Sequence, residues 1–208
     1  MKRKSILVLA ILCVLSISHS VWAGPTITDP YADAVISYTP GPGVGNASQA
    51  PPNGNDNPDA ALGAPEYNST SGAGFFVSLG DGGSIVLAFT DNIVVDGPGW
   101  DLKVYEVGSP ENAEVLVSND SGATFVSLGT AYATSSFDLL GTGLTWANTV
   151  RIVDDGGGPN SLVYMGFDLD AVEALNSAVI PSVPAPGALM LGGIGAVLVS
   201  RLRRRRTL

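Results

Sequence analysis

A series of short, apolar segments separated by turns is the feature that most limits what this chain can fold into. Seven segments are rich in Val, Ile, Leu, Phe and Tyr and often alternate apolar with polar residues, which is typical of strands. Clusters of Gly, Asn, Asp and Pro separate them. The seven are Phe75–Leu79, Ser84–Phe89, Asp101–Val107, Ala113–Ser118, Thr124–Leu128, Thr149–Val153 and Phe167–Leu175. This spacing predicts an all-β domain, an antiparallel β-sandwich with jelly-roll-like topology.

Charge falls into three blocks along the sequence. Basic residues open the chain at 2–4 and close it at 201–206, and only Lys103 and Arg151 lie between these blocks. All nineteen acidic residues lie in that middle part, so two basic residues leave it with 17 net negative charges, against −9 for the whole chain. Such a field repels nucleic acid and anionic lipid headgroups. We therefore expect the domain to bind no nucleic acid.

The chain has one Cys and one His, Cys13 and His19, and both lie in an N-terminal segment that we expect to be removed. The remaining domain then offers no thiol and no imidazole, which excludes a disulfide framework, a Cys/His zinc site and catalysis by either group. Paired carboxylates remain as a route to glycoside hydrolysis. Because the spacing of the nineteen acids marks out no such pair, we expect that the protein is not an enzyme.

The N-terminus has the three parts of a secretory signal peptide. A basic start, Lys2–Lys4, precedes an apolar stretch, Ile6–Ile17, and small residues follow at Val21 and Ala23. This order predicts export and cleavage by signal peptidase after Ala23. The alternative is an uncleaved N-terminal anchor, although the apolar stretch is short beside the about 20 residues that a membrane-spanning helix needs.

Residues 183–208 also have three parts: a Pro-rich start, an apolar stretch at 187–200, and a basic end. At about 1.5 Å per residue the apolar stretch barely crosses a hydrocarbon core of about 30 Å. Positive residues prefer the cytoplasmic side of the membrane. The tail therefore predicts a C-terminal transmembrane helix in the inner membrane, with its arginines inside and the domain outside.

This tail resembles the PEP-CTERM sorting domain, whose pattern is a Pro-Glu-Pro-like signature, a short transmembrane helix and an Arg-rich terminus. The resemblance implies processing by an exosortase, a membrane-embedded protease or transpeptidase, and an association with exopolysaccharide and biofilm. Ala185 stands where the family usually has an acidic residue. The alternative is an ordinary single-pass C-terminal anchor. The residues that match the sorting signal are Val183, Pro184, Ala185, Pro186, Arg201, Arg203, Arg204, Arg205 and Arg206.

The domain itself resembles the discoidin-like, galactose-binding-like sandwich modules of secreted bacterial proteins. The likeness lies in three stretches, an early loop at Asn57–Pro65, a hairpin at Glu114–Gly122 and the last strand at Phe167–Leu175. Many such modules hold a structural Ca²⁺ between the early loop and an acidic residue of the last strand, so the resemblance implies a calcium site here. Its candidate ligands are Asp56, Asp59 and Glu173.

Calcium takes six to eight oxygen ligands, and the Asx-rich loop at 55–59 supplies oxygens of the right kind. Strand alternation predicts that Glu173 shares a face with Ala171 and Leu175, whereas Asp168 and Asp170 point to the opposite face with Val172. The alternative interpretation is that these acids are solvated loop and edge residues.

The segment Ser118–Phe125 resembles an Asp-box turn. In such a turn Asp120 bonds its own loop backbone, Gly122 takes a positive φ, and Phe125 anchors the following strand. A single copy is more often a device that shapes a hairpin than a binding site, so we expect a hairpin here.

Two functions are compatible with the sequence: an exported, non-catalytic surface or matrix protein, and a carbohydrate-binding module. Aromatic side chains that can stack on sugars are Trp100, Trp146, Tyr105, Tyr132 and Tyr164, although such residues more often belong to a core or its rim. The expected partners are signal peptidase, exosortase and a polysaccharide. The expected organisation is a signal peptide at 1–23, the β domain at 24–175, a linker at 176–182 and the sorting segment at 183–208.

Overall fold

The computed structural model describes residues 29–44, 56–68, 70–71, 75–108, 110–156 and 166–180. The predicted signal peptide and sorting segment fall outside these ranges, as do Ala23 and the arginines of the tail. Among the described residues, no helix has the length and apolar character needed to span a membrane.

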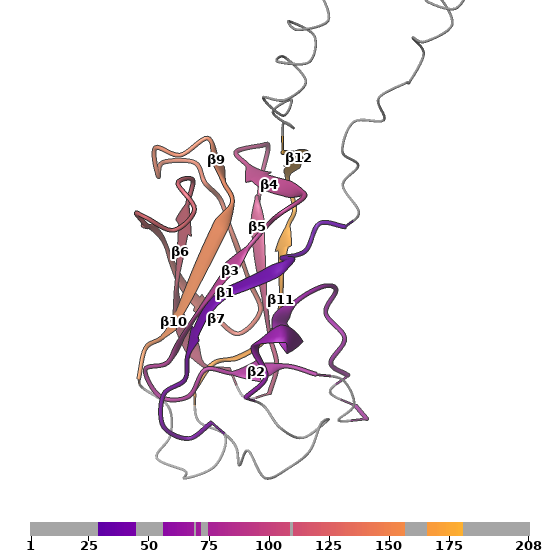
Figure 1. Cartoon of the computed structure of the whole chain (residues 1–208), viewed down its shortest axis with the longest axis vertical. Helices are drawn as coiled ribbons and strands as arrows, with labels where there is room; N and C mark the ends of the chain where they lie inside the picture. The colour runs from indigo at the N-terminus through magenta and orange to yellow at the C-terminus, as the bar shows by residue number, and fades with distance from the viewer. Residues whose placement is uncertain are drawn as a thin grey trace, which may run out of the picture. The chain divides into compact units, whose positions relative to one another are not determined.

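Three antiparallel sheets make up the described domain (Figure 1). The first contains five strands in the order β1 (Ala34–Thr39), β3 (Ser84–Ala88), β10 (Thr149–Asp154), β6 (Asn112–Ser118) and β7 (Val126–Tyr132). The second contains four, in the order β2 (Val77–Ser78), β11 (Asp168–Ala174), β5 (Leu102–Glu106) and β8 (Ser135–Phe137). The third is small, with β12 (Ser177–Val179), β4 (Asn92–Val95) and β9 (Trp146–Ala147) in that order.

Alternating side chains build one core between the two large sheets. On the five-stranded sheet Ile152 of β10 stands opposite Ile85 on one side and Val115 on the other, and all three are fully buried. On the four-stranded sheet Leu102 and Val172 belong to the same hydrophobic cluster. Because burial of apolar surface drives the two faces together, the domain is a β-sandwich, which confirms the predicted antiparallel all-β architecture.

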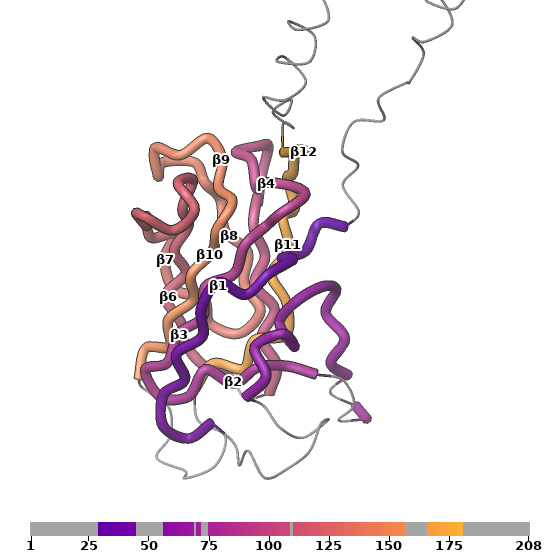
Figure 2. The backbone as a smooth tube through the Cα atoms, in the orientation of Figure 1, coloured from indigo at the N-terminus to yellow at the C-terminus, as the bar shows by residue number. Residues whose placement is uncertain are grey.

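The two ends of the domain lie together along β11. The stretch before β1 runs beside that strand, where Ala32 N–H donates to Val172 O at 3.0 Å and Ala174 N–H donates to Pro30 O at 2.8 Å (Figure 2). A short 3-10 helix, η1 (Pro58–Ala61), also packs against β11. Asn57 caps it by accepting from Asp59 N–H at 3.2 Å. The early loop at 57–65 and β11, which was predicted to be the last strand, are therefore neighbours, as the resemblance implied.

A β-bulge in β11 changes the side of the sheet to which its acidic residues point, relative to the prediction from alternation. Leu169 pairs with Glu106 and Ala171 pairs with Tyr105, so Asp170 is an extra residue in the ladder. Leu169 and Val172 both enter the core, a spacing of three that uninterrupted alternation does not allow. The prediction that Asp168 and Asp170 share a face with Val172 is therefore wrong, because the bulge turns Asp170 to the outer side with Glu173.

Each of the seven predicted strands coincides with an observed one, β2, β3, β5, β6, β7, β10 and β11. The sequence did not predict β1, β4, β8, β9 or β12. The last of these, Ser177–Val179, lies within the stretch 176–182 that was expected to be a linker, and it pairs with β4.

Candidate functional site

A cleft of about 460 Å³ lies where the loop after η1 passes the end of β5. Its walls combine aromatic rings, carboxyl groups and backbone, a composition typical of ligand-binding clefts of this volume. The lining residues are Pro65, Tyr67, Tyr105, Glu106, Val107, Gly108 and Asp170. Of these, only Tyr105 was named by the sequence as a candidate binding residue.

The bulge residue Asp170 holds the loop wall of the cleft in place. Its side chain is 3% exposed, and its two carboxylate oxygens accept the backbone N–H groups of Glu66 at 3.2 Å and Tyr67 at 3.3 Å. Burial raises the pKa of Asp170, while these two N–H donors oppose the rise. One residue inserted into β11 thus positions Tyr67 against the end of β5.

Tyr105 forms part of the opposite wall. Its hydroxyl donates a hydrogen bond of 2.6 Å to Glu173 Oε2, and Lys103 Nζ lies 4.3 Å from the centre of its ring. Burial raises the pKa of the Tyr105 hydroxyl, and the hydrogen bond to Glu173 raises it further. Tyr67, on the loop side, makes an edge contact with Phe76 at a centroid distance of 5.2 Å. Both tyrosines are therefore fixed by contacts outside the cleft.

Two carboxyl groups at the cleft have strongly perturbed acidities. Burial raises the pKa of Glu106 to about 8, and Asp168 and Glu111 add to the rise by repulsion. Burial likewise raises the pKa of Asp168 to about 7, although a hydrogen bond from Ser78 lowers this pKa in part. Within the described residues, Glu106 Oε1 and Asp168 Oδ1 are buried and accept no hydrogen bond. Perturbed acids gathered at a cleft mark it as the candidate functional site.

Replacing Glu106 with Gln is expected to stabilise the protein at alkaline pH and to change little in acid. The pKa of Glu106 is about 8 in the folded state against 4.5 in the unfolded chain, so the unfolded state loses its proton first. Stability therefore falls as pH rises between these two values, and the variant removes this fall. Melting curves of both proteins at about pH 4 and about pH 9 measure the difference. An identical pH dependence in the two proteins would contradict the assignment.

The predicted calcium ligands do not form a group of three within the described part of the chain. Asp56 and Asp59 are exposed on the loop that packs against β11, while Glu173 is half-buried and bonded to Tyr105. Their carboxylates are not brought within ligand distance of one another as a group of three in the described part of the chain. A structural Ca²⁺ at Asp56, Asp59 and Glu173 stays a prediction.

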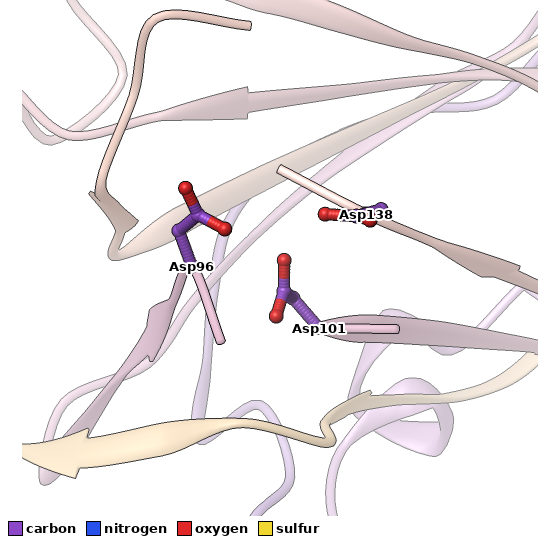
Figure 3. A group of neighbouring side chains, drawn as sticks. All are labelled: Asp96, Asp101 and Asp138. Carbon is purple, nitrogen blue, oxygen red and sulfur yellow. The ribbon is translucent and has the colours of Figure 1, made fainter. Parts of the chain in front are cut away.

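A different group of acids does converge, at the other end of β5. Asp96, Asp101 and Asp138 each turn a carboxylate toward a common space, with oxygen atoms within 4.8 Å of one another (Figure 3). Asp101 is fully buried, and it accepts Gly97 N–H at 2.9 Å, Leu139 N–H at 2.8 Å and Asn176 Nδ2–H at 2.8 Å. These hydrogen bonds compensate the cost of burying the carboxylate. They also link three loops to one side chain.

The predicted Asp-box hairpin is present between β6 and β7. Asp120 accepts the hydroxyl of Ser118 at 2.6 Å, together with the N–H of Thr124 at 2.9 Å and its hydroxyl at 2.7 Å. These bonds lower the pKa of Asp120 to about 2. Gly122 has φ +86°, as expected. All these contacts lie inside the turn, so the motif shapes a hairpin.

The other aromatic candidates are scattered over the surface. Trp100 and Tyr132 are 61% and 64% exposed, and neither lines the cleft. Trp146 is half-buried, and Tyr164 falls outside the described residues. Sequence reasoning missed Tyr67 and Glu106, because neither belongs to a motif with recognisable spacing.

No family model and no curated protein matches the sequence. The solved structures that this chain is similar to include the C-terminal domain of a chitobiase from Bacteroides fragilis, at 13% identity and a TM-score of 0.44, over 71% of this chain and 94% of that one. A Clostridium perfringens protein described as CpGH89CBM32-6 has 12% identity and a TM-score of 0.38, over 74% and 98% of the two chains. A Ruminococcus gnavus GH29 fucosidase in complex with fucose has 15% identity and a TM-score of 0.34, over 50% of this chain and 20% of that one. These values assign the chain to no family, so a function has to come from its own site.

Proposed function

We propose that this chain is an exported, non-catalytic protein of the cell surface or matrix whose jelly-roll-like sandwich binds carbohydrate in the cleft beside β5. The observation that carries the proposal is the composition of that cleft: two tyrosines and two carboxyl groups around a volume of about 460 Å³. Sugar rings present apolar C–H faces and many hydroxyl groups, and both find partners in such a site. Tyrosine suits a half-wet site because its ring is apolar and its hydroxyl is polar.

Each wall of the cleft has a part in this binding. Tyr67 and Tyr105 supply apolar surface, while Asp170 and Glu106 supply oxygens that accept hydroxyl groups. With its pKa raised to about 8, Glu106 keeps a proton near neutral pH and donates a hydrogen bond as well. Because Asp170 is pinned by two backbone N–H groups, the loop wall needs little reordering when a ligand binds.

Export rests on the two ends of the sequence. A signal peptide at 1–23 sends the domain across the inner membrane, and the tail at 183–208 holds it there until an exosortase acts at Pro184–Pro186. Mass spectrometry of the mature protein is expected to find a chain that begins after Ala23 and lacks Arg201–Arg206. An intact Arg-rich terminus would contradict processing and leave an ordinary membrane anchor.

A glycan array probed with the full chain tests carbohydrate binding. We expect saturable binding to a restricted set of glycans, and a loss of about fivefold in affinity for Tyr67→Ala, since one stacked ring contributes on the order of 1 kcal/mol. Trp100→Ala is the matched control, because Trp100 is 61% exposed and lies outside the cleft. Absence of binding to every glycan on the array would contradict the proposal. Loss of binding in Trp100→Ala alone would place the site elsewhere.

A further inference from the structure

The charge around the cleft is uneven. Glu106 and Asp170 line it, and the Oδ2 atom of Asp168 comes within 3.5 Å of where a side chain on Gly108, another lining residue, would begin. Glu173 lies against Tyr105. Two carboxyl groups therefore line the cleft and two more lie beside its lining residues, while Lys103, above the Tyr105 ring, brings one positive charge.

Two of these carboxyl groups each have one buried oxygen atom that accepts no hydrogen bond within the described residues. Glu106 Oε1 and Asp168 Oδ1 are sealed from solvent, and within the described residues no donor reaches either atom. An ionised carboxylate in such surroundings is costly unless a cation or hydrogen-bond donor compensates it. Burial therefore favours the protonated form of both groups near neutral pH, and a bound cation would favour their ionised forms.

The cation that fits this cleft is an organic ammonium group and not a metal ion. Calcium needs six to eight oxygens around one point, whereas the one group of three acidic side chains with oxygens within 4.8 Å in the described part of the chain is Asp96, Asp101 and Asp138. The cleft has room for a molecule and is walled by two tyrosines. An ammonium group is attracted both by carboxylates and by the faces of aromatic rings.

We propose that the cleft selects saccharides that carry a free primary ammonium group, such as hexosamine units without their N-acetyl group, over neutral and anionic sugars. The inference rests on carbohydrate binding in this cleft and adds the chemical class of the ligand. The sugar ring lies against Tyr67 and Tyr105, and its ammonium group faces Glu106, on the Gly108 side of the cleft, which is nearest to Asp168. An anionic sugar brings these carboxyl groups no positive charge, and it is repelled by them wherever they are ionised.

Titration calorimetry of the full chain with a glucosamine oligomer, and with the N-acetylated oligomer of the same length, tests this selectivity. We expect one site per chain and about tenfold or more tighter binding of the free amine, because a charge-assisted hydrogen bond contributes about 1.5–3 kcal/mol. Glu106→Gln and Asp168→Asn should each remove most of the difference, by weakening binding of the free amine far more than binding of the N-acetylated oligomer. The thermal stability of each variant shows whether it has folded.

A control is needed because a domain with 17 net negative charges attracts any polycation. Asp96→Asn removes one exposed carboxylate outside the cleft and should leave the preference intact, as should about 0.15 M salt, which screens exposed charges beyond about 8 Å. Equal loss in Asp96→Asn and Glu106→Gln would overturn the inference. Spermidine, which carries ammonium groups without a sugar ring, should bind more weakly than the glucosamine oligomer, and equal binding would also overturn it.

The outcomes separate the inference from the function on which it rests. Equal affinity for the amine and N-acetylated oligomers would leave carbohydrate binding in place and remove the selectivity. No binding of either oligomer, together with a silent glycan array, would remove both.

Discussion

Replacing Asp101 with alanine is expected to lower the free energy of unfolding by about 4 kcal/mol. The fully buried carboxylate accepts N–H groups from Gly97, Leu139 and Asn176, which lie in three different loops. Each buried donor left without a partner costs about 1–3 kcal/mol, and the donor of Leu139, the deepest of the three, cannot turn to water. A domain of this size has about 5–15 kcal/mol of stability in total, so the variant should be close to unfolding.

Denaturant unfolding measures this loss, and two further variants show its cause. Asp101→Asn keeps the shape and one acceptor oxygen, so it should fall between alanine and the native residue. Asp96→Ala removes a neighbouring exposed carboxylate and should change stability by less than about 0.5 kcal/mol. If Asp96→Ala were as damaging as Asp101→Ala, the three acids would act as one unit and the role given to the N–H donors would be wrong.

Gly166→Ala should destabilise the protein by about 3 kcal/mol or more. Gly166 has φ +90°, and a Cβ atom there would lie 2.4 Å from the backbone carbon and oxygen of Gly80. The positive φ costs an L-residue about 1–2 kcal/mol, and forcing two backbones apart in a packed region adds about 1–3 kcal/mol. The residue precedes Phe167, the largest fully buried side chain of the described core, so a shift here spreads into the core.

Gly99 provides a matched control for this substitution. It has the same φ of +90°, but nothing lies within 4 Å of the point where its Cβ atom would be. Gly99→Ala should therefore cost only the backbone strain, about 1–2 kcal/mol. Thermal or denaturant unfolding of the two variants isolates the effect of the close approach to Gly80. Equal losses would show that the two chain segments at Gly80 and Gly166 can separate.

The clearest predictions from the sequence are the strands whose apolar residues alternate. Ile85 and Leu87 in β3, or Val150 and Ile152 in β10, enter the core at every second residue. The strands that it missed have little pattern to detect. β8, β9 and β12 contain two or three residues each, and β1 exposes Ile36 by 52% at the edge of its sheet. Such strands are fixed by their partners and not by their own periodicity.

The candidate site was harder to predict than the fold, for two physical reasons. The bulge at Asp170 shifts the alternation of β11, and no residue in Phe167–Leu175 signals this shift, because the partner strand decides it. The cleft also joins Tyr67 from an irregular loop to Glu106 at the end of a strand, far away along the chain. The sequence did place a candidate acidic residue, Glu173, in Phe167–Leu175, and it named Tyr105.

Buried aspartates that hold the loops of the domain determine how its stability responds to salt. Asp101, Asp154 and Asp170 are buried and each accepts backbone N–H groups, so these anchoring contacts do not depend on an exposed opposite charge. Dissolved ions weaken contacts between exposed opposite charges, but they also relieve the mutual repulsion of an acidic surface. We therefore expect added salt to raise the thermal stability of this protein.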